Sequence, residues 1–327
     1  MSVRGTFRSI SAAVKGYERE ALKRQRELER EQKNLATMKE LERAYYEVQV
    51  YNNNLDVLTS LHKQASGIID WNTIKEKKPP IKPTKSSHYE EAAKSRFESY
   101  KPNFLDKLFN RVEKKKIKHE AAVSNGIKKD EINYQELISE YEQELMEWND
   151  TSCFAKRILS GDLDAYTEAL NQVNPINEIN QLGSLIKFNI ENRDLIKVDL
   201  FVNSETVIPK ESKYLLKNGR LSGKKITKTN YYAIYQDYVC SAVLRVARGL
   251  FALLPIRMVI VTAIGELLNT ATGYFEQKPI LSVALPKETL ENINFEWIDP
   301  SDSMDNFLYN MKFYKTKGFT TVERILL

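Results

Sequence analysis

The stretch "YYAIYQDYVCSAVLRVARGLFALL", residues 231–254, decides the fold that we predict for this chain. Aromatic and aliphatic side chains recur in it every three to four residues, as they do on the buried face of a helix. They are Tyr231, Tyr235, Tyr238, Ala242, Val246 and Leu250. Pro255 ends the pattern, because proline cannot continue a helix. The sequence therefore predicts a core helix that packs on a sheet.

Two pairs of strands are predicted to flank this helix along the chain. After it, "MVIVTAI" (residues 258–264) and "ILSVAL" (residues 280–285) are continuous apolar runs, which are typical of central strands covered on both faces. Before it, "LIKFNIE" (residues 185–191) and "LIKVDLFV" (residues 195–202) alternate around the turn "NRD", which indicates a β-hairpin. We therefore predict an α/β-sandwich-like domain with a mixed sheet over residues 184–327.

The sequence beyond the second apolar run carries three further signals. "NINFEWID" (residues 292–299) is a candidate for a third strand. Asp299 stands before Pro300, with Asp302 three residues after the cap, and this pattern predicts the start of a helix through "DPSDSMDNFLYNM". The last signal, "FTTVERI" (residues 319–325), predicts a closing strand.

The N-terminal part has a different composition. From about Ser9 to Gln64 it contains no proline, and after Gly16 no glycine, which predicts one long helix. Its heptad seam positions are occupied by Met38, Leu41, Tyr45, Val48, Leu55 and His62, with Asn52 and Thr59 as polar breaks. Such a seam packs either on a second copy or on another part of the same chain, and both interpretations stay open.

A Lys/Pro-rich segment, "KEKKPPIKPTKSSH" (residues 75–88), predicts a stiff, extended, solvated connection. Helical pattern then covers residues 89–183, with a short break near Gly126 and a new helix capped by Asp162. One face of it carries Leu137, Tyr141, Leu145 and Trp148. The prediction is an α+β protein in four parts: a long N-terminal, coiled-coil-like helix (1–74), the linker (75–88), a helical region (89–183) and the C-terminal domain (184–327).

Charge and cysteine usage limit the function. The 327 residues include 49 basic and 44 acidic ones, so the net charge is only +5 and any site for a polyanion must be local. A closed zinc site with four Cys or His ligands would need nearly all of the two cysteines and three histidines, and none of these are spaced in the usual pairs. The N-terminus lacks the apolar run of a signal peptide, and "GLFALLPIRMVIVTAI" (residues 249–264) is interrupted by Pro255 and Arg257. We therefore expect a cytoplasmic protein with no membrane contact and no bound metal.

The predicted order of helix, two or three strands, helix and strand near the C-terminal end is similar to the core of restriction-endonuclease-like folds. That resemblance implies a Mg²⁺-dependent nuclease, in which an acid-x-lysine pair and a second acid serve a metal beside the scissile phosphate. The matching residues are Glu276 and Lys278, with Asp237 or Glu266 as the second acid. However, the pair lies before the strand at residues 280–285, which contains no acid. We therefore expect a charged turn there rather than an active site.

"GRLSGKKIT" (residues 219–227) is the second candidate site. It does not match a nucleotide-binding loop, because only three residues separate its glycines and Lys225 replaces the hydroxyl residue that would hold Mg²⁺. What remains is a flexible loop with five basic residues and no acid among them: Lys217, Arg220, Lys224, Lys225 and Lys228. Followed by Tyr231 and Tyr232, it predicts a site that tracks phosphates while aromatic rings stack on bases. The alternative is a loop that only improves solubility.

On these grounds we expect a non-enzymatic assembly protein. Its N-terminal helices would form a homo-oligomer or dock a partner protein, and its C-terminal domain would supply recognition. The alternative is a protein that binds or processes nucleic acid with a restriction-endonuclease-like core, intact or degenerate. The first interpretation needs no cofactor, and the second needs only Mg²⁺. No residue of the chain stands in a recognisable nucleophile motif.

Overall fold

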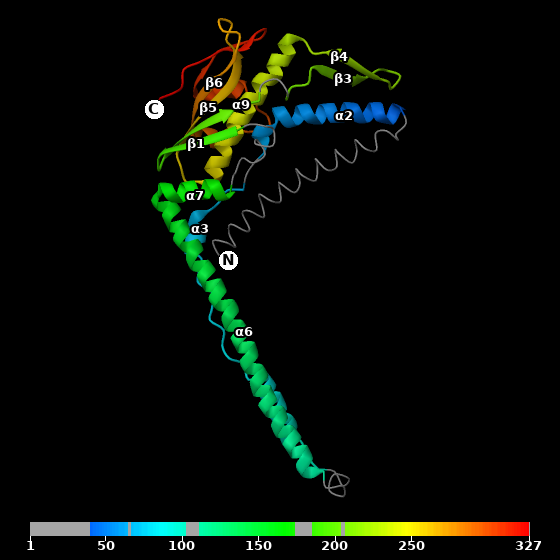
Figure 1. The fold of residues 1–327 in the computed structure, drawn as a ribbon, viewed down its shortest axis with the longest axis vertical. Helices are drawn as coiled ribbons and strands as arrows, with labels where there is room; N and C mark the ends of the chain where they lie inside the picture. Colours follow the sequence, from blue (N-terminus) through cyan, green and yellow to red (C-terminus); the bar gives the residue numbers. More distant parts are fainter. Residues whose placement is uncertain (1–39, 65–66, 103–110, 174–184, 204–206, 327) are drawn as a thin grey trace. The chain divides into compact units, whose positions relative to one another are not determined.

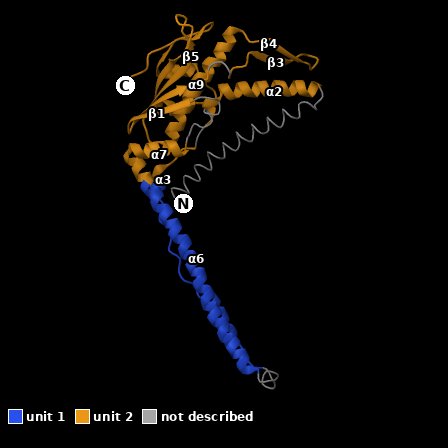
Figure 2. Cartoon of the chain, in the orientation of Figure 1, with its two compact units in different colours: residues 1–6, 73–153 blue, residues 7–72, 154–327 orange. Residues whose placement is uncertain are grey.

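The structure, a computed structural model, describes residues 40–64, 67–102, 111–173, 185–203 and 207–326 (Figure 1). The chain divides into two compact units (Figure 2). Unit 1 contains the described residues between 73 and 153. Unit 2 contains the described residues between 40 and 72 and between 154 and 326. The predicted α+β class is confirmed, because a long helix and a mixed sheet with helices are both present. The coiled-coil-like character of the N-terminal helix stays a prediction.

Unit 2 is built on a five-stranded sheet with the strand order β1-β2-β5-β6-β7. These strands are β1 (Leu185–Asn192), β2 (Leu195–Phe201), β5 (Met258–Leu268), β6 (Phe275–Pro286) and β7 (Leu308–Met311). β2 and β5 run parallel, and the other neighbours run antiparallel. The sheet is therefore mixed, and the predictions of the β1–β2 hairpin and of two central strands are confirmed.

The segment between β2 and β5 contains α9 (Lys228–Leu253), the helix predicted from residues 231–254. Thr227 begins it, because its hydroxyl accepts a hydrogen bond from the backbone N–H of Asn230. The helix ends just before Pro255, as predicted. Its fully buried residues include Tyr238, Ala242, Val246 and Leu250. α9 packs on β5, so burial of this apolar face fixes the helix on the sheet.

Residues 320–326 lie on the other face of the sheet. A Cβ added to Gly265 would come within 3.5 Å of the Tyr235 hydroxyl of α9, so α9 covers the Gly265 face of β5. Ile325 packs on Ile260 instead. Residues an odd number apart on a strand point to opposite faces. The sheet is therefore covered by α9 on one side and, over its middle, by an extended segment on the other.

The strand that we predicted over residues 319–325 is wrong. Only β9 (Gly318–Phe319) overlaps it, and β9 pairs with β8 (Phe313–Tyr314) instead of joining the main sheet. Beyond it, the backbone N–H of Ile325 donates to Ser282 Oγ (3.0 Å), and Arg324 forms an ion pair with Asp199. The backbone N–H of Val322 donates to the carbonyl oxygen of Pro279 in β6 (2.9 Å), but the partners of Arg324 and Ile325 are side chains. The segment therefore leaves β6 after this contact and crosses the sheet instead of forming a closing strand.

Two predictions for the segment before β7 also need correction. Residues 292–299 are all described and form no strand. Asp299 accepts hydrogen bonds from the backbone N–H groups of Ser301 (2.8 Å) and Asp302 (3.1 Å), but the N-cap position of the following turn is occupied by Ser301. The helix is only a short 3-10 turn, η3 (Asp302–Asn306), since the following residues extend into β7 and pair with β6. The expected order of the restriction-endonuclease-like core is therefore not observed.

The described part of the N-terminal helix, α2 (Glu40–Thr59), packs on its own chain. Figure 1 shows it beside a separate hairpin, formed by β3 (Glu211–Leu215) and β4 (Leu221–Lys225). α2 also contacts α9, and a short 3-10 helix after it, η2 (Leu61–Lys63), continues that contact. This half of unit 2 therefore joins residues far apart in the sequence.

In unit 1, Gly126 has a role that the sequence analysis missed. The unit contains α4 (His88–Glu98) and residues 112–153 of α6 (Val112–Ser160). The predicted break near Gly126 is wrong, because α6 continues through it. A Cβ on Gly126 would lie 2.7 Å from the carbonyl oxygen of Tyr89, and Asp130 of α6 accepts a hydrogen bond from the Tyr89 N–H (3.1 Å). Glycine here permits a close approach to the start of α4 rather than a turn.

The Lys/Pro-rich linker follows α3 (Trp71–Glu76) and has no helix or strand from residue 77 to residue 87, as predicted. It is anchored at two points. Trp148 Nε1 donates to the carbonyl oxygen of Lys77 (2.7 Å), and Lys85 forms an ion pair with Glu131. The linker therefore contacts α6 at Glu131 and at Trp148, one of the four residues of the predicted helical face.

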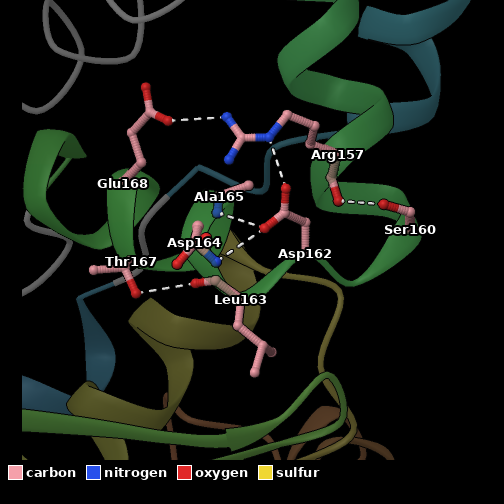
Figure 3. Close-up of polar contacts among 8 residues, drawn as sticks. All are labelled: Arg157, Ser160, Asp162, Leu163, Asp164, Ala165, Thr167 and Glu168. Atoms are coloured by element: carbon pink, nitrogen blue, oxygen red, sulfur yellow. Dashed lines mark hydrogen bonds and ion pairs between the residues drawn. The ribbon is translucent and has the colours of Figure 1, made fainter.

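α7 (Leu163–Val173) begins at the predicted cap, Asp162 (Figure 3). The carboxylate of Asp162 accepts hydrogen bonds from the backbone N–H groups of Asp164 (3.0 Å) and Ala165 (3.2 Å). Arg157 donates to the same carboxylate (2.7 Å) and thereby holds the pKa of Asp162 below its ordinary value. The cap prediction is confirmed.

Candidate nucleic-acid interface

β3 and β4 form an ordered hairpin around residues 216–220, where we predicted a flexible loop. Gly219 has a positive φ of 79°, which glycine adopts without strain. The N–H of Leu216 donates to the carbonyl oxygen of Arg220 (2.9 Å) and closes the turn. The loop prediction is therefore wrong. The missed signal is the dipeptide Asn218-Gly219, which favours a hairpin turn between two strands.

One face of the hairpin packs on α2. Lys213 Nζ lies 3.0 Å from Glu47 Oε2, and this hydrogen bond holds the pKa of Glu47 below its ordinary value. Arg43, one turn away on α2, lies 3.3 Å from the same carboxylate. A Cβ on Gly219 would come within 3.3 Å of Leu41 Cδ2, so α2 also approaches the turn. α2 therefore positions the hairpin by one of its two faces.

The other face of the hairpin points away from α2. Residues directly opposite each other on paired strands share a face, and successive residues alternate between faces. Lys213 lies opposite Gly223, on the face toward α2. The outer face of the hairpin therefore carries Tyr214 opposite Ser222 and Ser212 opposite Lys224. On this face Tyr214 (42%) and Lys224 are exposed, and Ser212 and Ser222 are half-buried.

The hairpin concentrates positive charge. Residues 207–228 contain seven basic residues and one acidic residue, a net charge of +6, whereas the whole chain has +5. Five of the seven are the basic residues named in the sequence analysis: Lys217, Arg220, Lys224, Lys225 and Lys228. All five are exposed, and none of them has an ion pair within the part of the chain that the structure describes. Their charge is therefore available to a bound anion.

The two tyrosines after the hairpin pack on the protein. Tyr231 and Tyr232 are half-buried in the first turns of α9, with ring centroids 5.4 Å apart. A Cβ on Gly318 would lie 2.8 Å from the Tyr232 ring, so this ring is in close contact with β9. The prediction that both rings stack on bases therefore has no support here, because their surfaces already have partners.

Glu276 and Lys278, the acid-x-lysine pair, bind each other. Their charged groups lie 3.0 Å apart at the start of β6. Asn269 Nδ2 also donates to Glu276 Oε1 (2.6 Å), across the turn between β5 and β6. Hydrogen bonds from Asn269 and Lys278 hold the pKa of Glu276 below its ordinary value. Both residues are paired with β5, so the expectation of a charged turn before the strand is wrong. The arrangement is that of a charged strand end whose groups neutralise each other.

Asp237 lies elsewhere, on α9. Burial raises its pKa to about 6, with the negative charge of Asp299 as the next cause, while a hydrogen bond with Ser301 acts in the opposite direction. None of the interactions described for Asp237 includes Glu276 or Lys278. Among the described residues, moreover, no group of three or more His, Cys, Asp or Glu side chains is placed to hold a metal ion. Glu266, the other candidate for the second acid, lies opposite Gln277 in the β5–β6 ladder. Glu276 and Lys278 lie opposite Leu267 and Gly265, so Glu266 is on the other face of the sheet. The structure therefore brings neither candidate for the second acid together with the pair.

The heptad seam of α2 is only partly covered. Leu41 and Tyr45 are each 56% exposed, whereas Val48 and Leu55 are half-buried. The fully buried residues of α2, Ala44 and Leu58, lie off the predicted seam. Met38 lies outside the described residues. No observation tests whether this seam meets a second copy, so that interface stays a prediction.

A buried polar cluster at η2 is a feature that the sequence analysis missed. His62 Nδ1 lies 2.9 Å from Ser241 Oγ of α9, and the backbone N–H of His62 donates to the same hydroxyl (2.9 Å). Arg248 donates to the carbonyl oxygen of His62, and its guanidinium lies 4.0 Å from the centroid of the Phe295 ring. These partners are far apart in the sequence, so no local pattern could reveal them. The cluster anchors η2 on α9.

Comparison of the chain with protein-family models, with curated proteins and with solved structures found no match. Within the residues that the structure describes, no helix is long and apolar enough to cross a membrane.

Proposed function

We propose that this chain is a non-enzymatic interaction protein whose α+β unit binds nucleic acid through the β3–β4 hairpin. The observation that carries the proposal is the set of five exposed basic side chains, without ion pairs in the described structure, on a hairpin that α2 holds in place. Cations of this kind form charge-assisted contacts with phosphate oxygens and release counterions from the nucleic acid. The recognition role expected of the C-terminal domain is thereby assigned to one surface.

The surroundings of the acidic residues support the non-enzymatic part of the proposal. A metal-dependent nuclease needs its carboxylates around one metal ion. Glu276 is already bound by Lys278 and Asn269, and Asp237 interacts with Asp299 and Ser301. Glu276 and Asp237 therefore have separate partners, and Glu266 lies on the other face of the β5–β6 ladder from Glu276.

The binding claim is tested with a fluorescently labelled DNA duplex and two double variants. Lys224→Gln/Lys225→Gln removes two hairpin cations, and Lys315→Gln/Lys317→Gln removes two exposed cations at the β8–β9 turn. Fluorescence anisotropy at one moderate salt concentration should show about tenfold weaker binding for the hairpin variant. The control variant should bind as the parent does. Equal affinity of all three proteins would contradict the proposal.

Cleavage assays separate this proposal from the nuclease alternative. The parent protein, incubated with DNA and RNA in the presence of Mg²⁺, should leave both intact. If it cleaves either substrate, Glu276→Ala tests whether the acid-x-lysine pair is the active site. In a nuclease the Glu276 carboxylate would bind the metal ion and not the phosphate backbone of the nucleic acid, so its loss would abolish cleavage with little loss of affinity. Mg²⁺-dependent cleavage that disappears in Glu276→Ala would show that the protein is an enzyme.

Self-association through α2 is a second proposal, favoured by the exposure of Leu41 and Tyr45 on the seam. Light scattering at micromolar concentration should report a dimer for the parent protein. Tyr45→Asp should be a monomer, because a charge in a buried seam has no partner. Tyr45 is the better site for this change, since Leu41 also approaches the hairpin. A monomeric parent protein would contradict self-association and leave the hairpin proposal intact.

The cytoplasm is the compartment that we propose for this interaction. Cys153 and Cys240 are both free thiols, and unpaired thiols persist in reducing compartments. Cys240 is fully buried in α9, and this burial raises the pKa of its thiol, which keeps it protonated and unreactive.

A further inference from the structure

The hairpin is a two-stranded ribbon whose size suits one feature of duplex DNA. β3 and β4 pair over their full lengths, Glu211–Leu215 with Leu221–Lys225. A ribbon of this length is about 17 Å long, and its strands lie about 5 Å apart. The major groove of B-DNA is about 12 Å wide and admits a two-stranded ribbon, whereas the minor groove, at about 6 Å, is too narrow for one.

The ribbon has one covered face and one open face. α2 covers the face of Lys213, as the ion pair with Glu47 indicates. The open face carries Tyr214, Ser222 and Lys224, whose hydroxyl and ammonium groups are donors of the kind that bind guanine and thymine acceptors in the major groove. The fourth residue of this face, Ser212, donates instead to the carbonyl oxygen of Lys224 (3.0 Å). A helix-backed ribbon can therefore present this single face to base edges.

Basic side chains stand at both ends of the ribbon. Lys217 and Arg220 belong to the turn, and Lys225 and Lys228 lie where β4 leads into α9. Lys225 lies opposite Glu211, on the side of the ribbon toward α2, and its side chain is exposed. Phosphates border a DNA groove on both sides, and contacts to them fix the register of a protein on the duplex. Across a groove, a protein meets a phosphate backbone, then base edges, then the other phosphate backbone. The ribbon presents cations at one end, a polar face in the middle and cations at the other end, which is the same sequence of contacts.

Single strands and RNA duplexes fit the hairpin less well. Binding a single strand without sequence preference depends on several exposed aromatic rings on which successive bases stack. On the hairpin only Tyr214 is such a ring, because Tyr231 and Tyr232 contact each other and Tyr232 packs on Gly318. In an A-form RNA duplex the major groove is deep and narrow, which excludes a ribbon.

From this arrangement we infer that the nucleic acid is duplex DNA and that the ribbon of β3 and β4 lies in its major groove. The face of Tyr214, Ser222 and Lys224 is then directed toward the bases. The inference rests on the proposed function, because it names the ligand of the same surface. It adds two statements to the proposed function: the nucleic acid is duplex DNA, and the hairpin occupies the major groove. Each is tested separately from phosphate binding by the hairpin.

The first experiment compares three labelled probes of the same sequence and length: a DNA duplex, one of its single strands and the RNA duplex. We expect the DNA duplex to bind about tenfold more tightly than the other two. Methyl green, a major-groove ligand, should displace the protein, and netropsin, a minor-groove ligand, should not. A single strand or RNA duplex that binds as tightly as the DNA duplex, or displacement by netropsin alone, would overturn this inference and leave the proposed function standing. Failure of all three probes to bind would overturn both.

The second experiment places a negative charge on the open face. Ser222→Glu should weaken binding of the DNA duplex about tenfold, because the carboxylate would meet acceptor groups and phosphates. Thr316→Glu, in the exposed turn between β8 and β9, adds the same charge elsewhere and should bind as the parent does. Tyr214→Ala, which adds no charge, should also weaken binding. Circular dichroism melting checks that each variant is folded. A folded Ser222→Glu or Tyr214→Ala protein with the parent's affinity would overturn the placement of this face.

Discussion

α9 and the β3–β4 hairpin follow one another in the chain but are held by different interactions. Most residues of α9 from Tyr235 to Leu253 are buried, and burial of apolar surface contributes about 25 cal/mol per Å². Most residues of the hairpin are exposed, and its contact with α2 includes the ion pair between Lys213 and Glu47. An exposed ion pair contributes at most about 1 kcal/mol. The apolar scaffold therefore sets the stability, while the candidate binding surface can carry charge at little cost to the fold.

The largest effect should come from charging the core helix. Val246 is 0% exposed, so Val246→Asp would bury a carboxylate without a partner and lower the free energy of unfolding by about 4 kcal/mol. The matched control on the hairpin is Leu221→Asp, because Leu221 is 37% exposed, and its cost should be about 1 kcal/mol or less. Urea denaturation followed by circular dichroism measures both. A Val246→Asp protein with the parent's midpoint would mean that the buried face of α9 is assigned incorrectly.

A smaller effect should come from acid, through the polar contact between η2 and α9. His62 is 2% exposed, and burial lowers its pKa below the ordinary value. The His62 imidazole therefore binds a proton more readily in the unfolded chain than in the folded protein. This contribution to stability is complete above about pH 6.5 and is lost as the pH falls toward the lowered pKa of the folded protein.

Urea denaturation of the parent and of His62→Asn, at about pH 7.5 and about pH 5.5, tests this contribution. The parent should lose more stability between the two conditions than the variant, whose asparagine does not titrate. Equal losses would assign the acid sensitivity to other groups.

The smallest effect should come from the ion pair that ties the hairpin to α2. Lys213→Met should cost about 0.5 kcal/mol, because the lysine side chain is 43% exposed and solvent screens the pair. Hydrogen exchange should become faster for the amides of β3 but not for those of β5. Lys315→Met, in the β8–β9 turn, is the control and should change neither. If Lys213→Met lowered the free energy of unfolding as much as Val246→Asp does, the hairpin would support the core, and α9 and the hairpin would not differ in their contribution to stability.

Apolar pattern predicted the parts of the fold that apolar burial holds. α9 and the β1–β2 hairpin were expected because their apolar side chains repeat with the period of the element. The central strands β5 and β6 were expected because they are continuous apolar runs. The pattern failed where long-range contacts decide. Residues 319–325 contain strand-forming residues, but Ile325 bonds to the Ser282 hydroxyl instead of a strand backbone. Gly126 carried the signal of a break, yet its neighbour is Tyr89, whose position the sequence does not reveal.

The candidate site was predicted in composition but not in form. The five basic residues of the hairpin were singled out because no acid stands among them. Their common surface depends on the pairing of β3 with β4 and on Glu47, which lies 166 residues before Lys213 in the chain. Spacing alone also suggested Glu276 and Lys278 as a catalytic pair. Spacing places two charges on one side of a strand, but it does not say whether they bind a ligand or, as here, each other.

The central claim is that the hairpin cations contact phosphates, and the most direct test is the slope of log binding constant against log salt concentration. It is measured with one DNA duplex for the parent, for Lys224→Gln/Lys225→Gln and for Lys315→Gln/Lys317→Gln. Each lost phosphate contact flattens the slope by about 0.9 for B-DNA, so the hairpin variant should be flatter than the parent by about 1.8. The β8–β9 variant should keep the parent's slope. A hairpin variant with the parent's slope, or two variants flattened equally, would contradict the claim.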